Sequence, residues 1–166
     1  MQSGQPAKRI GELLVERGLV SQRQLEDALA RQRATGEFLG AILLKQQVIQ
    51  PKALLEAIAE QFGISYESID PVRMDWSATK LFPPSQLSDG NWFPIRADAV
   101  SVTVAIANPL DAAALSAAQR AAGAHMVKPV LVLEHELRAV IKAYREQALR
   151  ALAARLNHHT DDQTTE

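Results

Sequence analysis

Glutamine and glycine recur near the start of this chain at a spacing of 29 residues, and both residue types can bind a polar ligand. Gln32 is repeated as Gln61, and Gly11 is repeated as Gly40. A glutamine amide offers one donor group and one acceptor. A glycine inside a helix start costs about 0.5 to 1 kcal/mol relative to alanine, so its recurrence suggests that another group approaches the backbone closely. We therefore expect two equivalent half-sites.

The repeated residues belong to two 24-residue segments, 9–32 (RIGELLVERGLVSQRQLEDALARQ) and 38–61 (FLGAILLKQQVIQPKALLEAIAEQ), separated by RATGE. Most of the other matches are apolar: Ile10 with Leu39, Leu14 with Leu43, Leu19 with Val48, Leu25 with Leu54, Ala28 with Ala57 and Leu29 with Ile58. Packing alone explains these matches equally well, because two helical hairpins that share a core need similar buried faces.

Each copy is predicted to form a short helix, a turn and a longer helix. In the first copy, Gly18 is suited to end the short helix, and Ser21 and Gln24 have the spacing of a capping box for the longer one. In the second copy, Pro51 supplies a fixed φ at the first helical position and Gly63 ends the helix.

Behind the repeats, alternating strands and helices predict a small α/β subdomain over residues 64–154. Strands are expected at 64–69, 91–95, 100–107 and 126–133. Helices are expected at 111–122 and from 134 to about 154, with a short one before Pro83 and a turn at Asp89-Gly90. Residues 1–8 read as a flexible leader and 155–166 as a disordered tail. The fold class is therefore α+β, with tandem helical hairpins over 9–63 preceding the α/β subdomain.

Composition limits the function classes. The 166 residues are 47% apolar and 22% charged, with a net charge of -1 and no cysteine. These values indicate a soluble globular protein that lacks the cationic excess of nonspecific nucleic-acid binders, and no apolar stretch approaches the length of a membrane span. Neither a GxxxxGK[ST] loop nor a GxGxxG fingerprint is present. The four histidines lack metal-site spacing, so we expect no metal, and no residue grouping looks like an active site.

A turn in the α/β part is a further candidate site. Asn108 follows a predicted buried strand, and Asp111 precedes a predicted helix. Asp111 is expected to cap that helix. Asn108 is open to a structural or a ligand-facing role, because such turns lie at strand ends where ligands bind.

The double pattern resembles the MshEN-type domain, the N-terminal domain of type II secretion and type IV pilus assembly ATPases that is also attached to glycosyltransferases. The similarity rests on Arg-apolar-Gly, then Gly-Leu-Val, then Leu-x-x-Ala-Leu-x-x-Gln, which the second copy follows with changes. The segments VTVAIANPLD and KPVLVLEHELRAVIKAYRE resemble the second half of that domain, so the similarity covers about residues 9–146.

The resemblance implies binding of the bacterial second messenger cyclic di-GMP, with one motif holding each half of the dinucleotide. Arg9 would bond phosphate or guanine acceptors and stack on a base. The backbone at Ile10, Gly11, Leu39 and Gly40 would approach the ligand, and Gln32 and Gln61 would bond its polar edges. The implied apolar bed consists of Leu14, Leu25, Leu29, Leu43, Leu54 and Ile58.

The second copy departs from the pattern at two positions. Phe38 stands where the first copy has Arg9, so that half-site lacks a cation and relies on apolar contact. Gln47 stands where the first copy has Gly18, which is expected to alter the hairpin turn. We expect both changes to reduce affinity more readily than abolish it.

The expected protein is a sensor without catalytic activity, located in the cytoplasm or at the inner face of the membrane through a partner. That partner would be a protein or a host ATPase or glycosyltransferase. The main alternative is a docking module that binds no nucleotide. A DNA-binding helix-turn-helix is less favoured, because apolar repeats occupy the positions of base-reading side chains, and an enzyme is the least favoured class.

Overall fold

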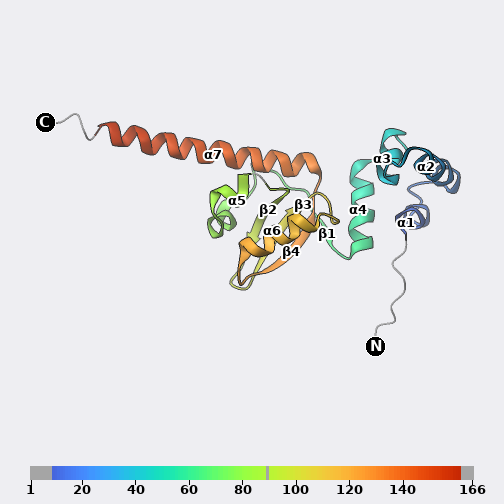
Figure 1. The fold of residues 1–166 in the computed structure, drawn as a ribbon, viewed down its shortest axis with the longest axis horizontal. Coiled ribbons are helices and arrows are strands. Elements are labelled where there is room, and N and C mark those ends of the chain that lie inside the picture. Colours follow the sequence, from blue (N-terminus) through green and yellow to red (C-terminus); the bar gives the residue numbers. More distant parts are fainter. Residues whose placement is uncertain (1–8, 89, 162–166) are drawn as a thin grey trace. The chain divides into compact units, whose positions relative to one another are not determined.

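The structure is a computed structural model that describes residues 9–88 and 90–161, with side chains up to residue 156. The chain divides into two compact units, Met1–Tyr66 and Glu67–Glu166. The predicted leader, residue 89 of the predicted turn and residues 162–166 of the predicted tail lie outside the described residues. The α+β class is confirmed, because helices and a small sheet share the chain (Figure 1).

The first unit contains the two predicted helical hairpins. They are formed by α1 (Ile10–Glu16) with α2 (Gln22–Thr35) and by α3 (Leu39–Lys45) with α4 (Pro51–Phe62), and β1 (Ser65–Tyr66) ends the unit. Helix α1 contacts α4 as extensively as α2 contacts α3. Helix α1 is equivalent to α3, and α2 is equivalent to α4, so the contact of α1 with α4 is equivalent to the contact of α3 with α2. The contact pattern is therefore that of a closed, two-fold pair, whereas a simple solenoid would bring only consecutive helices together.

The helix ends follow the expected capping chemistry. Ser21 and Gln24 form the capping box, each side chain bonding the other residue's backbone N–H at 3.2 and 2.8 Å. Gly36 and Gly63 end α2 and α4 with φ of 73° and 65°, in the left-handed region where glycine carries no Cβ penalty. Pro51 begins α4.

A single apolar core joins the two hairpins. Five pairs of its buried residues occupy equivalent positions in the two copies, which accounts for the recurrence of apolar residues; Leu39 is buried without its counterpart Ile10. The buried members are Leu13, Leu14, Val20, Leu25, Ala28, Leu39, Ile42, Leu43, Ile49, Leu54 and Ala57.

The hairpin turn of the second copy is not altered, contrary to the prediction from Gln47. Gln47 adopts φ 55°, close to the 68° of Gly18. The backbone bonds are equivalent as well: Gly18 N to Val15 O at 2.9 Å and Gln47 N to Leu44 O at 3.0 Å. The tertiary packing of the repeat imposes the left-handed turn. Gln47 therefore adopts this conformation despite the steric penalty that a Cβ carries in that region.

Replacing Gln47 with glycine should therefore stabilise the protein by about 0.5 to 1 kcal/mol, since relief of the left-handed strain exceeds the added entropy of the unfolded chain. Chemical denaturation followed by far-UV circular dichroism measures the change. Gly18→Ala is the matched control and should destabilise. An unchanged or lower stability for Gln47→Gly would show that the glutamine side chain makes a compensating contact.

The second unit is a small α/β fold. Before its sheet it contains the 3-10 helix η1 (Trp76–Leu81), which matches the predicted short helix, and α5 (Pro84–Ser88), which was not predicted. The remaining elements are β2 (Trp92–Ala97), β3 (Ser101–Ile106), α6 (Ala112–Ala122), β4 (Met126–Leu131) and α7 (Glu134–Asp161). No described helix has the length and apolarity needed to cross a bilayer.

Strand β3 lies between the other two strands of this unit. It pairs antiparallel with β2, aligning Trp92 with Ile106, and parallel with β4, aligning Ser101 with Met126. Nearly every residue of β3 is buried, so both faces of the sheet are covered. Helices α6 and α7 both contact the sheet. Tyr144 of α7 packs edge-on against a strand residue, with its ring 5.5 Å from that of Phe93.

Two predicted element bounds were wrong. The strand expected at 64–69 is reduced to Ser65–Tyr66. One further backbone bond follows, from Glu67 N to Leu131 O at 2.9 Å. Side chains then hold this segment: Glu67 receives two bonds from Arg96, at 2.8 and 2.6 Å, and Ser68 bonds Glu136 at 2.5 Å. The last helix continues to Asp161 rather than ending near residue 154. Residues 155–161 of the predicted disordered tail are therefore helical. They follow directly on residues 148–156, a run of alanine, leucine and arginine, which are strong helix formers.

Candidate functional site

Arg9 and Phe38 occupy equivalent places at the starts of α1 and α3. Both are N-cap residues with extended backbone, at φ -64°, ψ 143° and φ -67°, ψ 139°. Neither side chain caps its helix. Arg9 is exposed, and Phe38 is 81% exposed, although a phenyl ring gains nothing from water. A cation and an aromatic ring are therefore presented to solvent at the two related positions.

The predicted ligand-binding residues of the repeats separate into a buried group and a partly exposed group. Leu14 and Leu43 have no exposed surface, and Leu25, Leu39 and Leu54 are also buried, so these five form the core rather than a surface. The partly exposed residues are Ile10, Leu29, Gln32, Gly40, Ile58 and Gln61. Ile10, Leu29 and Ile58 pack against the core and still present surface. Together with the exposed Arg9 and Phe38, this second group presents the surface that a ligand can touch without a rearrangement of the unit.

The recurrent glycines have a packing role within each hairpin. A Cβ on Gly11 would lie 2.8 Å from Leu25 Cδ1, and a Cβ on Gly40 would lie 3.1 Å from Leu54 Cδ2. Leu25 and Leu54 are equivalent residues of the two copies. Glycine thus lets the short helix approach the leucine of its own longer helix, which is a sufficient cause for its recurrence. A ligand-facing role for these glycines stays a prediction.

Gly11→Ala should destabilise the first unit by about 1 to 2 kcal/mol, because overpacking against buried Leu25 outweighs the gain in helix propensity. Gly40→Ala should change stability little, because the added Cβ would lie farther from Leu54, at 3.1 Å, and Gly40 itself is partly exposed. Thermal unfolding of the ligand-free variants measures both. Equal effects of the two substitutions would contradict this account.

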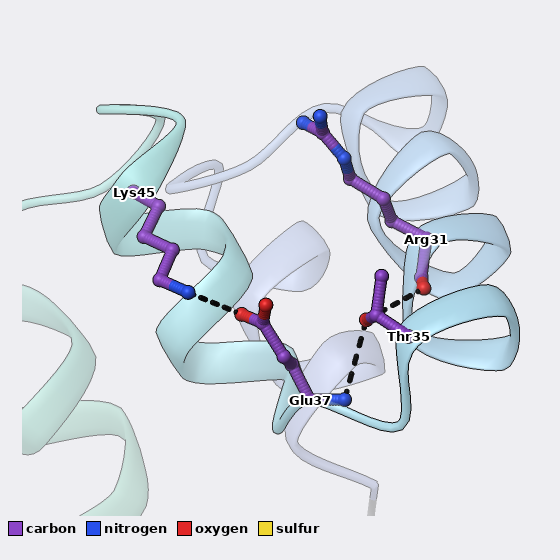
Figure 2. A network of polar contacts seen from close by, with 4 residues as sticks. All are labelled: Arg31, Thr35, Glu37 and Lys45. Carbon is purple, nitrogen blue, oxygen red and sulfur yellow. Dashed lines mark hydrogen bonds and ion pairs between the residues drawn. The ribbon is translucent and has the colours of Figure 1, made fainter.

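A polar network, missed by the sequence reasoning, orders the linker between the copies. The Thr35 hydroxyl donates to the Arg31 carbonyl at 3.0 Å, Glu37 N donates to Thr35 Oγ1 at 3.3 Å, and Lys45 Nζ lies 2.6 Å from Glu37 Oε2 (Figure 2). These bonds connect the end of α2 to α3. The threonine and glutamate of RATGE were the available signal, since both can bond nearby backbone.

The two-fold relation extends to this linker region and is imperfect there. Arg17 forms an ion pair with Glu60. The equivalent positions are Gln46 and Arg31, and both of these line one hollow beside the polar network. The equivalent positions Gln46 and Arg31 therefore cannot form the ion pair that Arg17 and Glu60 make. The N-caps differ in the same way, with Arg9 in the first copy and Phe38 in the second.

Asn108 lies in the second unit, at the predicted turn after β3. Its Oδ1 accepts from Leu110 N at 3.0 Å, so its side chain stabilises the turn. Asp111 caps α6 as predicted, by accepting from Ala114 N at 2.9 Å. Asn108 is also exposed to a hollow of about 720 Å³ at the carboxyl ends of β3 and β4. A ligand-binding role for Asn108 stays a prediction.

The described side chains of the repeat unit include groups suited to binding a ligand. Within residues 9–88 and 90–156, no group of three or more histidine, aspartate or glutamate side chains could hold a metal ion. The repeat unit presents a cation, an aromatic ring, partly exposed aliphatic side chains and two amides, arranged about an approximate two-fold relation. Such a set suits an anionic ligand with flat rings and two similar halves.

The MshEN domain family model matches residues 62–151, and the chain belongs to this family. The matched region begins at the end of α4 and covers the α/β unit, whereas the sequence resemblance was based mainly on the repeats. The family is therefore confirmed through the half of the chain that had the less distinctive motifs.

Relatives of known sequence include a bacteriophage adsorption protein and a type IV pilus assembly ATPase. The chain is 31% identical over 128 residues to bacteriophage adsorption protein B of Escherichia coli K12, covering 77% of this chain and 17% of that protein. It is 36% identical over 107 residues to the type IV pilus assembly ATPase PilB of Thermus thermophilus, covering 64% of this chain and 12% of that one. The chain thus spans less than a fifth of each relative's length.

Two solved structures share the fold. "Structure of MshE with cdg", where cdg denotes cyclic di-GMP, has a TM-score of 0.69 at 30% identity and covers 82% of this chain and 99% of that one. The N-terminal domain of XpsE has a TM-score of 0.56 at 20% identity, covering 86% and 98%, which shows a common fold alone. An alignment covering 82% of the chain extends well beyond the residues that the family model matches.

Proposed function

We propose that this chain is a cyclic di-GMP-binding regulatory domain and that its tandem repeat holds the dinucleotide. The observation that carries the proposal is the likeness to the MshE structure with cdg, at 30% identity over most of the chain. The ligand has two chemically identical halves. A two-fold ligand is matched by the two-fold contact pattern of α1 with α4 and of α2 with α3.

The half-sites of the proposal differ in chemistry. On one side, the Arg9 guanidinium bonds phosphate or guanine oxygens and stacks on a base. On the other, Phe38 stacks on the second guanine without neutralising charge. Leu29 and Ile58 supply apolar contact, and Gln32 and Gln61 bond polar edges, because these are the motif residues that keep exposed surface.

Regulation in this proposal acts through a larger assembly. The pilus ATPase relative extends far beyond the region that this chain matches, so a cytoplasmic host ATPase or another partner protein would read the bound state. A ligand shifts a conformational equilibrium only as far as it binds one state more tightly than the other. The linker network between α2 and α3 is a candidate for the responsive element, since it joins the two half-sites.

Isothermal titration of the chain with cyclic di-GMP tests the proposal. We expect one dinucleotide per chain with a dissociation constant of about micromolar or tighter, corresponding to roughly -8 kcal/mol. Cyclic di-AMP is the matched control, because it keeps the phosphates and alters the base edges. No heat and no thermal shift at saturating ligand would remove the proposal.

A docking module without a nucleotide is the second candidate, and one observation favours it. The buried leucines and the packing of Gly11 and Gly40 explain much of the repeat pattern with no ligand at all. Under this function Arg9 and Phe38 would contact a protein partner. The same titration separates the candidates, since a folded chain that does not bind cyclic di-GMP supports the docking function.

A further inference from the structure

The two equivalent helix contacts of the repeat unit differ in their charged residues. At the contact of α1 with α4, the carboxylate of Glu60 pairs with the guanidinium of Arg17. At the contact of α2 with α3, Arg31 occupies the position equivalent to Glu60, and Gln46 occupies the position equivalent to Arg17. The second contact therefore has a guanidinium on its longer helix and a neutral amide at the end of its shorter one.

The guanidinium of Arg31 has no carboxylate partner within residues 9–88 and 90–156. In Figure 2, Thr35 bonds only the backbone carbonyl of Arg31, and no dashed line reaches its guanidinium. Over the same ranges, the side-chain amide of Gln46 also lacks a hydrogen bond to the protein. One side of the repeat thus has a carboxylate for its arginine, and the other side has none.

A hollow of about 370 Å³ makes both groups accessible. It is lined by Arg31, Thr35, Glu37, Ile42, Lys45 and Gln46, which come from α2, the linker and α3. The carboxylate of Glu37 already pairs with Lys45 at 2.6 Å, so the charge of Arg31 stays unneutralised. Ile42 is buried and gives the hollow an apolar wall.

This hollow is separate from the surface proposed for the dinucleotide. Arg31 and Leu29 are two positions apart on α2, which places them on roughly opposite sides of a helix with 3.6 residues per turn. The residues that line the hollow include no residue assigned to cyclic di-GMP. A function of this hollow does not depend on nucleotide binding.

We propose that the hollow is a docking site for an acidic side chain of a partner protein. The guanidinium of Arg31 offers paired N–H donors that match the two oxygens of a carboxylate. The amide of Gln46 adds a further donor. Because Arg31 belongs to the first hairpin and Gln46 to the second, a docked carboxylate connects the two hairpins.

The charge of the hollow favours a carboxylate over a phosphate group. A carboxylate already completes the equivalent contact, where Glu60 pairs with Arg17. The single unneutralised guanidinium balances one negative charge, whereas a phosphate group carries nearly two. The carboxylate must come from outside the hollow, because Glu37 is the only acidic residue that lines it and is bonded to Lys45.

Nuclear magnetic resonance titration of the isotope-labelled full chain tests the chemistry of the site. The probe is the peptide acetyl-Ala-Glu-Ala-amide, and the neutral acetyl-Ala-Gln-Ala-amide is its matched control. We expect only the glutamate peptide to shift the side-chain signals of Arg31 and Gln46, with saturation. No shift at these residues, or equal shifts with both peptides, would overturn the proposal. Tighter binding of inorganic phosphate at the same residues would indicate a small-anion site and would also reject protein docking.

The substitution Gln46→Glu supplies the missing carboxylate from within the chain at almost unchanged volume. It should weaken binding of the glutamate peptide at least about tenfold, because Arg31 would then be paired internally. Gln50→Glu is the matched control, since it adds the same charge at the N-cap of α4, outside the hollow. It should leave peptide binding nearly unchanged, and far-UV circular dichroism checks that both variants are folded.

Arg31→Gln is the second variant, and it removes the guanidinium from an exposed position. We expect it to abolish the peptide-induced shift at Gln46. Unchanged peptide binding in Arg31→Gln or in Gln46→Glu would show that the hollow is not the binding site. Equal weakening by Gln46→Glu and Gln50→Glu would show that net charge governs binding, which would also reject the site.

Discussion

Replacing Leu14 with alanine is expected to destabilise the repeat unit by about 2 to 5 kcal/mol, the range for a buried leucine whose removal leaves a cavity. Leu14 has no exposed surface and lies in the core that joins both hairpins. Leu43 is its equivalent in the second copy and is equally buried. Leu43→Ala should therefore cost a similar amount.

The placement of the aromatic residues allows a specific measurement. Both tryptophans, Trp76 and Trp92, lie in the second unit. Tryptophan fluorescence during urea unfolding therefore reports that unit, whereas far-UV circular dichroism also reports the helices of the repeats. Leu14→Ala should move the circular dichroism transition to lower urea while leaving the fluorescence transition nearly in place. Coincident shifts of both signals would show that the two units unfold together.

Phe38→Ala is the matched control within the repeat unit. Its side chain is 81% exposed, so the truncation leaves no cavity and should change stability by less than about 0.5 kcal/mol. A small effect of Leu14→Ala beside this control would contradict the core assignment. The comparison also bears on the binding experiments. A Leu14 variant that no longer binds ligand would have lost binding through unfolding of the repeat unit.

Capping and periodicity were sufficient to predict the helical hairpins. Ser21, Pro51 and Gly63 act locally, through bonds within a few residues, so their effect on the helix ends does not depend on the rest of the fold. Asp111 was predicted for the same reason. The strand at 64–69 was predicted too long. Glu67 and Ser68 bond the side chains of Arg96 and Glu136, which are too distant in sequence for a local pattern to reveal.

The division of the motif residues between core and surface could not be predicted. Leu14 and Leu29 fit the same helical apolar spacing, yet Leu14 is fully buried and Leu29 is partly exposed. Periodicity identifies an apolar face without saying what covers it. Gly11 shows the same difficulty, because a glycine serves a close leucine as well as a close ligand. Gln47 differs in kind: its left-handed turn is imposed by the matching packing of the two copies.

Arg9→Ala is expected to weaken cyclic di-GMP binding by about 1.5 to 3 kcal/mol, the range for a hydrogen bond to a charged group. This loss corresponds to roughly 10- to 150-fold in the dissociation constant. Arg9 is exposed and makes no capping bond with its side chain, so the stability of the repeat unit should not change. Arg9→Lys should recover only part of the affinity, because an ammonium lacks the planar fork that bonds and stacks.

Phe38→Arg provides the complementary change, since it places at the second N-cap the residue found at the first. The two backbones have nearly the same φ and ψ, so an introduced guanidinium would occupy the related position. We expect tighter binding and a steeper dependence on salt, because a second cation would meet the dinucleotide's other phosphate. Titration at low and high salt measures both effects. If Arg9→Ala left the affinity unchanged while Phe38→Ala alone abolished binding in a folded chain, the cation would be wrongly assigned, and the aromatic half would carry the recognition.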